Sequence, residues 1–451
     1  MSIHQKLLGG ILLVNMNRLG EARWTRKTTW MFISFVLGLA LESYVFSLAS
    51  IAIYWVTMPK ALGELLLAWA PIWLIVGIIL AGPFSDKYGR KVTLYSTLVL
   101  YAVGGIVLFF GDSVSVILIS LALMLIAGGG EMNSIMVASH ELMPRKHRGK
   151  ATMMIINGIN FGGTVLAILA LTTADITGKP AVALQRDVVA IAVLIVVAIL
   201  FATRVTMPES FLWLQKKGRT QQLDKTVTSY FGSEVYADAV VKEVAESAAP
   251  PSHPASPGYL WFTMIIMIIV AAANTIGFGL MAYALAFAFF PHLQPAILAV
   301  FEGAGFVIGF LGLIADRVSR KKFLFWSFLG TFVMTVIVGL TTKVWQHDMT
   351  LFWILLIILA GVNSLCYLTE DTVKEEVWPT LHRGTLTAIA RFISIGLYIP
   401  TIYITANMSP THYILFNAGV WLVGTLAAAA WLIWGRETGR GVSIQVASGE
   451  T

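Results

Sequence analysis

Twelve apolar runs, each on the order of 20 residues or longer, recur along almost the whole 451-residue sequence. A helix of that length crosses a hydrocarbon core about 30 Å thick. Inside a bilayer, only helices and closed barrels satisfy their own backbone hydrogen bonds. The sequence therefore predicts an all-α membrane protein with 12 transmembrane helices. The predicted spans cover 30–56, 64–84, 92–111, 115–138, 150–173, 187–205, 259–290, 294–315, 323–342, 349–369, 385–407 and 413–434.

The composition agrees with a chain whose main solvent is lipid. Hydrophobic residues make up 57% of the sequence and charged residues only 12%, whereas about a quarter of the residues in soluble domains are charged. No short leader with a small-residue cleavage site precedes the first span, so we expect the first helix itself to direct insertion. The expected location is the plasma membrane, as a multi-pass protein of a bacterial inner membrane.

The distribution of basic residues predicts the orientation, because Lys and Arg concentrate in cytoplasmic loops. If both termini are cytoplasmic, 26 of the 31 basic residues lie on the cytoplasmic side of the membrane. Arg391 lies within a span. The net charge of +7 is then a topology signal and does not indicate nucleic acid. The basic residues left outside are Lys60, Lys179, Arg186 and Lys343.

Cysteine usage excludes two kinds of site. The single cysteine, Cys366, lies inside a predicted span, so an intrachain disulfide and a cysteine-based metal cluster are both excluded. A small apolar filler is the simplest role for it, and no metal site is predicted.

A polar stretch at 206–258 divides the spans six and six and is predicted to be a cytoplasmic linker. The predicted organisation is a cytoplasmic segment at 1–29, a six-helix half at 30–205, the linker, a second six-helix half at 259–434 and a cytoplasmic tail at 435–451.

Two spaced motifs recur at the same places in the two halves. GPFSDKYGRK at 82–91 corresponds to GLIADRVSRKK at 312–322, and ELMPRKHRG at 141–149 corresponds to EVWPTLHRG at 376–384. Such repetition indicates that the halves are duplicated. Parallel six-helix repeats with a binding site between them, near the middle of the membrane, are one known transporter architecture.

At these motifs the chain resembles the major facilitator superfamily, and within it the sugar porter and metabolite:proton symporter branch, over nearly its whole length. Further signatures of that branch are PESFLWLQKKGR at 208–219, GRETGRG at 435–441 and LALESYVF at 39–46. The residues that fit the superfamily loop motif G-x-x-x-D-[RK]-x-G-[RK]-[RK] are Gly82, Asp86, Lys87, Gly89, Arg90 and Lys91.

The resemblance implies a secondary active transporter that works by alternating access, without a cofactor and as a monomer. Proton-coupled symport of a small polar metabolite is the leading expectation, with the proton as coupling ion. A proton-driven efflux antiporter is the alternative within transport. A non-transporting membrane sensor and an enzyme are less favoured, because linker and tails are short and no nucleophile elbow, P-loop, zinc motif or cofactor fingerprint is present.

The duplicated motifs are predicted to latch the cytoplasmic helix ends. Aspartate and arginine four residues apart can form charge-assisted bonds to each other or to neighbouring helix ends, and Gly89 permits a tight turn. The alternative is that these charges are solvated loop residues that only fix topology. The predicted latch residues are Gly82, Asp86, Gly89, Arg90, Glu141, Arg148, Asp316, Arg320, Glu376 and Arg383.

Four charged residues lie inside predicted spans and away from their ends, where each costs about 2.5–3.5 kcal/mol even on lenient scales. Glu42 is near the middle of the membrane and is the first candidate for carrying the proton, unless it is a permanently protonated core residue. Glu131 follows three glycines that allow a close helix approach, and it either binds proton or substrate or pairs within the bundle. Glu302 either lines the cavity or pairs. Arg391 either snorkels to the surface or anchors an anionic group or a buried glutamate.

Other polar residues within spans are candidates for substrate contact, although an isolated Asn in a membrane helix also serves as helix-to-helix glue. The carboxylates from Glu370 to Glu376 are expected to gate or latch the tenth helix. The candidates for the substrate cavity are Tyr44, Glu131, Asn157, Asn160, Asn274, Tyr283, Glu302, Asn363, Tyr367 and Arg391.

The sequence departs from the sugar porters at two places. The run LALMLIA at 121–127 is wholly apolar, whereas sugar porters have an arginine there as partner of the first-helix acid. The seventh span also lacks their pair of glutamines. Glu42 therefore needs another partner or a proton, and the substrate class stays open between a sugar, an organic acid and a small organic cation.

Overall fold

The computed structural model contains, among the residues it describes, 12 helices that are long and apolar enough to cross a membrane. The prediction of an all-α membrane protein is thereby confirmed. The structure describes residues 24–55, 60–111, 113–175, 182–205, 207–231, 256–378 and 383–440.

The first six spans form one bundle. In it α2 packs against α5, α6 and α7, while α4 packs against α5 and α7. The bounds of these helices are α2 (Arg26–Ala52), α3 (Lys60–Tyr88), α4 (Arg90–Phe110), α5 (Val114–Leu142), α6 (Arg148–Asp175) and α7 (Val182–Arg204).

The last six spans form the second bundle, in which α11 packs against α17 and α18, and α14 packs against α16 and α18. The seventh span continues beyond α11 through a π-helical turn, and the eighth ends in a 3-10 turn. The elements are α11 (Pro257–Gly279), the π turn (Leu280–Ala284), α12 (Leu285–Phe289), α13 (Gln294–Gly309), the 3-10 turn (Phe310–Arg317), α14 (Arg320–Leu340), α15 (Thr342–Trp345), α16 (Met349–Glu376), α17 (Arg383–Thr405) and α18 (Pro410–Trp434).

Polar side chains fix where several spans begin. Ser113, Ser319 and Ser409 accept hydrogen bonds from backbone N–H groups in the first turns of α5, α14 and α18, and Asp348 does the same for α16. Such caps satisfy donors that the helix leaves unpaired. For this reason α14 begins at Arg320, before the apolar run itself begins.

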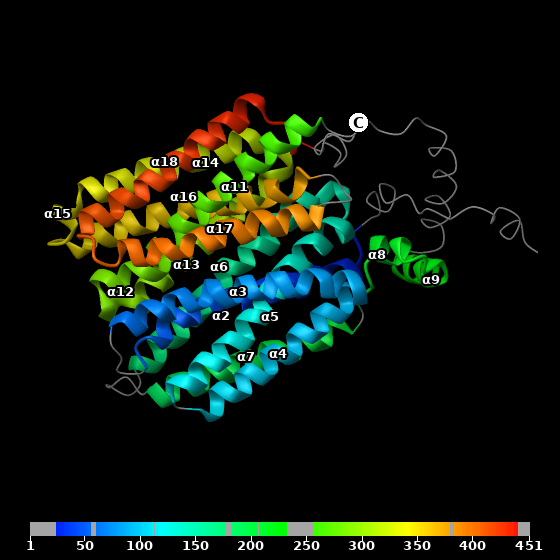
Figure 1. The fold of residues 1–451 in the computed structure, drawn as a ribbon, viewed down its shortest axis with the longest axis horizontal. Coiled ribbons are helices and arrows are strands. Elements are labelled where there is room, and N and C mark those ends of the chain that lie inside the picture. Colours follow the sequence, from blue (N-terminus) through cyan, green and yellow to red (C-terminus); the bar gives the residue numbers. More distant parts are fainter. Residues whose placement is uncertain are drawn as a thin grey trace, which may run out of the picture.

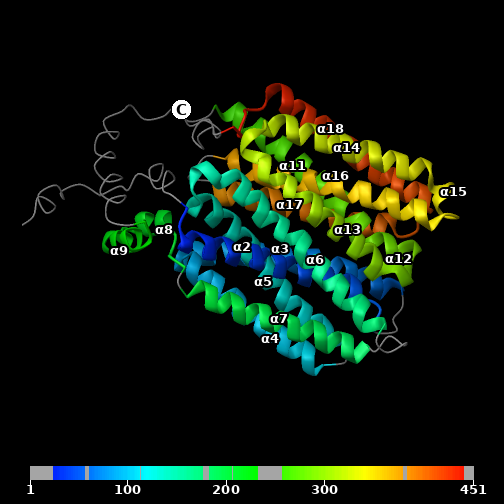
Figure 2. The ribbon, with the colours of Figure 1, turned by 180° about the vertical axis from the view of Figure 1, so that it is seen from behind.

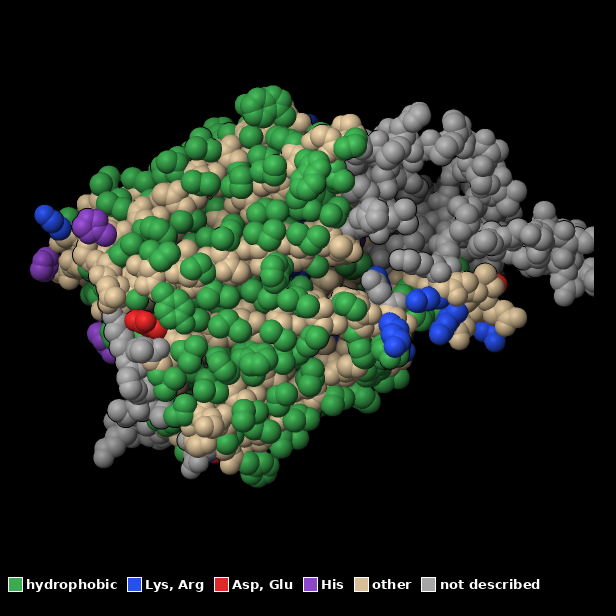
Figure 3. Space-filling view, in the orientation of Figure 1, with side chains coloured by type: hydrophobic (Ala, Val, Ile, Leu, Met, Phe, Trp, Pro, Cys, Tyr) green, Lys and Arg blue, Asp and Glu red, His purple; other side chains and the backbone are tan. Residues whose placement is uncertain are grey.

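The two bundles lie side by side (Figures 1 and 2) and meet along two helix pairs, α6 with α13 and α3 with α17. Large apolar side chains such as Leu80, Val99 and Leu426 are exposed on the outside, and apolar side chains cover most of the face seen in Figure 3. A surface of this kind fits contact with lipid chains.

The described part of the linker lies at one end of the molecule, as the two short helices α8 (Phe211–Lys216) and α9 (Thr220–Phe231). Lys27 Nζ at the start of α2 donates a hydrogen bond to the Ser229 carbonyl of α9. Basic side chains gather at this end (Figure 3). That asymmetry is the basis of the predicted orientation, and we refer to this end as the linker end.

Candidate functional site

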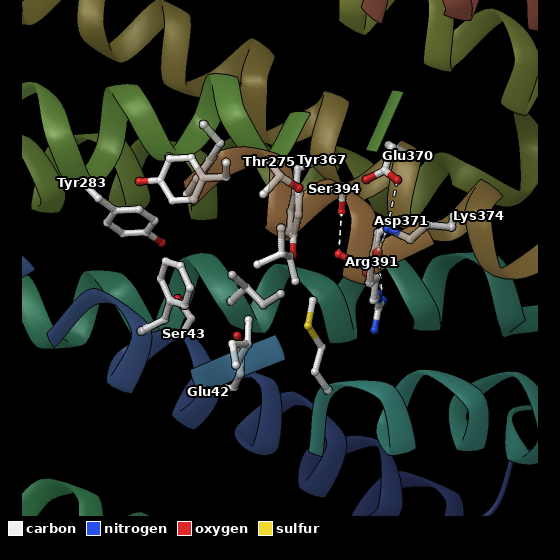
Figure 4. Close-up of a pocket in the computed structure, with 18 residues that line it drawn as sticks. Glu42, Ser43, Thr275, Tyr283, Tyr367, Glu370, Asp371, Lys374, Arg391 and Ser394 are labelled. Carbon is white, nitrogen blue, oxygen red and sulfur yellow. Dashed lines mark hydrogen bonds and ion pairs between the residues drawn. The ribbon is translucent and has the colours of Figure 1, made fainter. Parts of the chain in front are cut away.

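A cavity lies between the two bundles, near the middle of the spans. Its volume of about 90 Å³ is smaller than the range of about 300–1,000 Å³ that is usual for small-molecule sites. Its polar and aromatic lining comes from α2 of the first half and from the seventh, tenth and eleventh spans of the second (Figure 4). These lining residues are Glu42, Ser43, Phe46, Thr275, Phe278, Tyr283, Tyr367, Glu370, Asp371, Lys374, Arg391, Ser394 and Tyr398.

Glu42 provides the acidic group of the first half. Its side chain lines the cavity and is 5% exposed. Helix α5 passes close behind it, because a Cβ added at Gly128 would stand 3.1 Å from Glu42 Cγ, so the glycine leaves the room that this carboxylate occupies. Among the described residues, none forms an ion pair or a hydrogen bond with the Glu42 carboxylate. The acid that sequence reasoning placed near the middle of the membrane therefore faces the cavity without a fixed partner.

A network of acids and bases on α16 and α17 forms the opposite wall. Lys374 Nζ lies 2.9 Å from Glu370 Oε1 and 2.7 Å from Asp371 Oδ1. Arg391 Nη2 lies 2.9 Å from Asp371 Oδ1 and 3.3 Å from Glu375 Oε1. Positions three and four residues apart on a helix share a face, so one face of α16 carries the three acids and Lys374.

Arg391 does not snorkel to the membrane surface. Its side chain is buried and bound to Asp371 (Figure 4). Of the two roles considered for Arg391, the structure therefore supports the second, in which it anchors a buried acid. Glu370, Asp371 and Glu375 lie in the interior, because α16 continues to Glu376 with all of them buried. The gating or latch role expected for them stays a prediction.

Glu131 lies outside the cavity lining, so of the two roles considered for it the structure has the pairing within the bundle. Its Oε1 accepts a hydrogen bond from Arg204 Nη2 at the end of α7. Arg204 also donates to Ser34 Oγ of α2 at 3.3 Å and to the Leu94 carbonyl of α4 at 3.0 Å. Both charged side chains are fully buried, so this pair holds four helices of the first half together.

The four asparagines also lie away from the cavity lining. Asn157 donates to the Phe306 carbonyl at 3.1 Å, and Asn160 donates to Ser364 Oγ at 2.9 Å. These bonds join α6 to the second half, which is the glue role that was the alternative. Asn274 donates to Glu370 Oε2 at 3.2 Å, and Asn363 is buried in α16.

The three tyrosine candidates divide between cavity and packing. Tyr283 and Tyr367 line the cavity. Tyr44 instead donates to the Val189 carbonyl of α7 at 3.1 Å. Tyr283 Oη lies 3.1 Å from Glu302 Oε1 and can donate to it, so Glu302 pairs behind the cavity wall.

The sequence prediction does not place two of the buried basic residues in the interior of the protein. Lys374 was counted among the cytoplasmic residues because it lies near the end of a span, and Arg204 was counted there for the same reason. The signal that could have found Lys374 is its spacing from Glu370 and Asp371, which places all three on one helix face.

Equivalent glutamates cap equivalent helices at the linker end. Glu209 Oε1 accepts from the Arg90 backbone N–H at 2.8 Å, and Glu437 Oε1 accepts from the Arg320 backbone N–H at 2.8 Å. Negative charge at a helix N-terminus is stabilising. Gly89 has φ 103°, a conformation that favours glycine, as the tight turn predicted there requires.

A hydrogen bond from a backbone N–H group to a carboxylate joins the two halves at this end. Asp316 Oδ2 accepts from the Lys150 backbone N–H at the start of α6 at 3.3 Å. Asp316 Oδ1 lies 3.7 Å from Arg320, whose Nε lies 3.5 Å from Glu376.

The other latch candidates contribute locally or lie outside what is described. Arg383 Nη2 donates to the Trp378 carbonyl at 3.1 Å, and Arg90 Nη1 donates to the Ser85 carbonyl at 3.2 Å. A Cβ at Gly149 would meet Arg320 and Asp316, whereas one at Gly82 would meet nothing within 4 Å. The side chains of Asp86 and Glu141 lie outside the described part of the structure, and Arg148 lies in the first turn of α6.

Comparisons with known proteins agree on one family. The sequence model of the Major Facilitator Superfamily matches residues 30–397. The minor myo-inositol transporter IolF of Bacillus subtilis is 21% identical over 349 residues, which cover 72% of each chain. The 4-hydroxybenzoate transporter PcaK of Acinetobacter baylyi is 22% identical over 417 residues, which cover 88% of this chain and 89% of PcaK.

Solved structures show the same fold. The proton:xylose symporter XylE, bound to 6-bromo-6-deoxy-D-glucose, superimposes with a TM-score of 0.77 at 17% identity and covers 92% of this chain and 97% of XylE. An inward-open structure of XylE from E. coli superimposes with a TM-score of 0.70 at 18% identity, covering 92% and 98% of the two chains.

Proposed function

The chain belongs to the Major Facilitator Superfamily of membrane transporters, and on that basis we propose that it imports a small polar metabolite together with a proton by alternating access. It is a multi-pass plasma membrane protein, and a transporter rather than an enzyme. In the proposed arrangement both termini are cytoplasmic, and one copy works alone without a cofactor.

The observation that carries proton coupling is the placement of Glu42. Burial away from water disfavours the charged form of a carboxyl group, and Glu42 is 5% exposed without a fixed partner among the described residues. The other carboxylates of the cavity wall, Glu370 and Asp371, each have Lys374 within 3 Å. Glu42 is therefore the carboxyl group whose protonation disturbs the fewest bonds, which is what a reversible proton carrier needs.

Contacts at both ends of the cavity support alternating access. At the linker end, Asp316 of the second half binds the start of α6 in the first. At the opposite end, Gln294 Nε2 of α13 donates to Ser50 Oγ of α2 at 2.9 Å, and the rings of Phe46 and Tyr283 lie 5.2 Å apart. Each end therefore has its own small set of contacts between the halves that can open.

The substrate is a small polar metabolite of the sugar, organic acid or organic cation class. The names of the relatives include a myo-inositol transporter and a 4-hydroxybenzoate transporter, so the family alone does not choose among these classes.

The test is uptake by proteoliposomes with an imposed pH gradient, acid outside. Xylose, 4-hydroxybenzoate and choline serve as probes of the three classes. We expect one probe to accumulate only with the gradient, and Glu42→Gln to lose that dependence. Asp187→Asn is the matched control, since Asp187 pairs with Arg186 at the start of α7, away from the cavity. Uptake that ignores the gradient in the wild type would contradict proton coupling, and gradient-driven export would identify an antiporter.

A further inference from the structure

The guanidinium of Arg391 is only partly used by the protein. Its Nη2 donates to both oxygens of Asp371, each at 2.9 Å. Its Nε and Nη1 are buried and have no hydrogen-bond partner among the described residues, and the side chain is 1% exposed. Leaving cationic donors buried and unpaired is unfavourable. Unpaired donors of this kind at a cavity wall indicate that a ligand supplies the hydrogen-bond acceptor during transport.

We propose that Arg391 anchors the carboxylate of the substrate, and that the substrate is therefore a small organic acid. This inference rests on the proposed function, in which Glu42 carries the proton. Arg391 is then the charged group of the cavity wall that has unpaired hydrogen-bond donors. In Figure 4, the Arg391 side chain extends past Asp371 toward the helices of the first half, on the side where the cavity lies. A carboxylate there would accept charge-assisted hydrogen bonds from Nη1.

The other charges of the wall are already paired. Lys374 binds Glu370 and Asp371, while Glu375 lies 3.3 Å from Arg391 and accepts from Thr387 Oγ1 at 3.2 Å. A cationic substrate has no free carboxylate here except Glu42, which the proton occupies in the loaded state. The pairing thus favours an anion over a cation.

The lining also disfavours a sugar. A sugar presents several hydroxyls, each of which needs donors or acceptors at defined positions when it is buried. None of the described residues that line the cavity is an asparagine or a glutamine. The amide groups that could meet hydroxyls from both sides are therefore missing from this wall.

The remaining lining indicates the body of the acid. Phe278 stacks with Tyr367 at 6.0 Å and meets Tyr283 edge to face at 5.6 Å, and Phe46 continues this wall. Aromatic side chains favour offset or edge contacts with another ring. The geometry points to an aryl or similarly flat carboxylate, held by Arg391 at one end and by the aromatic wall along its body.

The experiment measures binding without a gradient, so that it is independent of proton coupling. The full chain in detergent micelles is titrated with benzoate, with benzyl alcohol as neutral analogue and with benzylamine as cationic analogue, and thermal stability is recorded. We expect benzoate alone to raise the melting temperature. Arg391→Gln should weaken benzoate binding at least about tenfold, as loss of a charged hydrogen bond does. Asp371→Asn, which removes the negative charge that faces Nη2, should tighten it.

Arg204→Gln is the matched control, because it breaks a buried pair away from the cavity. It should lower the baseline melting temperature and leave the benzoate-induced shift in place. Equal shifts from benzyl alcohol and benzoate, a preference for benzylamine, or unchanged benzoate binding in Arg391→Gln would each overturn the carboxylate site. If Arg391→Gln does not fold, the three-probe comparison in the wild type and the direction of change in Asp371→Asn decide the question. If benzoate binds but a pH gradient does not drive its uptake, the proposed proton coupling is rejected and the carboxylate site is retained.

Discussion

Arg204 at the end of α7 donates a hydrogen bond to Glu131 in the middle of α5, and the two side chains are 1% and 0% exposed. Buried ion pairs are costly to break from one side, because the remaining charge is left without compensation. This pair is therefore a stability element of the first half, and neither residue is among those that line the cavity.

Removing one member of this pair should destabilise the protein strongly. We expect Arg204→Gln or Glu131→Gln to lower the free energy of unfolding by about 3–5 kcal/mol, measured by denaturation in detergent micelles. The double variant should recover much of that loss, since neither charge is then left alone. Lys225→Gln, an exposed site on α9, is the control and should change stability by less than about 0.5 kcal/mol. A double variant as unstable as the sum of the singles would argue against a coupled pair.

Glu42 should make transport depend on external pH. In a symporter the proton is a co-substrate, so uptake rises as the outside becomes more acidic. We expect this rise in the wild type and a flat profile in Glu42→Gln, which cannot take up or release a proton at that position. Uptake across a series of external pH values, at fixed internal pH, checks this. A Glu42→Gln profile parallel to the wild type would place the proton elsewhere.

The glycines of α5 set how close α3 approaches. A Cβ at Gly129 would meet the Leu74 carbonyl oxygen and stand 2.9 Å from the Ile78 backbone nitrogen of α3. Backbone cannot yield as a flexible side chain can, so Gly129→Ala should cost about 1–3 kcal/mol. Gly419→Ala in α18 is the matched substitution, because a Cβ there meets nothing within 4 Å. It should be neutral or stabilising by up to about 1 kcal/mol, and thermal unfolding distinguishes the two.

The sequence predicts more of the fold than of the candidate site. The twelve spans and the duplicated halves follow from apolar length and repeated motifs. The placement of Glu42 and Arg391 in the interior follows from the cost of charge in lipid. The rotation of each helix does not follow, because lipid-facing and core-facing residues are both apolar. Asn157 and Tyr44 were therefore expected in the cavity although they face other helices.

Ion-pair partners were the other unpredictable element. Arg204 and Glu131 lie on different spans, and only the packing of both α5 and α7 against α4 and α2 brings them together. A basic residue near a span end can snorkel or turn inward, and sequence position alone does not distinguish these outcomes. Lys374 and Arg204 both turn inward.

The bond between Asp316 and the start of α6 should bias the protein toward closure at the linker end. Asp316→Asn removes the negative charge that binds the Lys150 N–H and lies near Arg320. The reporter is a cavity cysteine, Ser394→Cys, in a Cys366→Ser background. We expect this cysteine to react several-fold faster with a thiol reagent supplied from the linker end when Asp316→Asn is present than when it is absent. Asp316→Glu keeps the charge and serves as control. Equal labelling rates in Asp316→Asn and its parent would show that this contact does not control opening.

The opposite end offers the converse experiment, because a different bond closes it. Gln294 Nε2 donates to Ser50 Oγ, and both residues are buried, so Gln294→Ala removes the bond and leaves space between α13 and α2. We expect the same cavity cysteine to become more reactive toward reagent from that side and less reactive from the linker end. The two variants must change labelling in opposite directions, because opening one end by alternating access requires the other to stay closed. Increases from both sides in either variant would indicate loosened packing instead of a shift between two states.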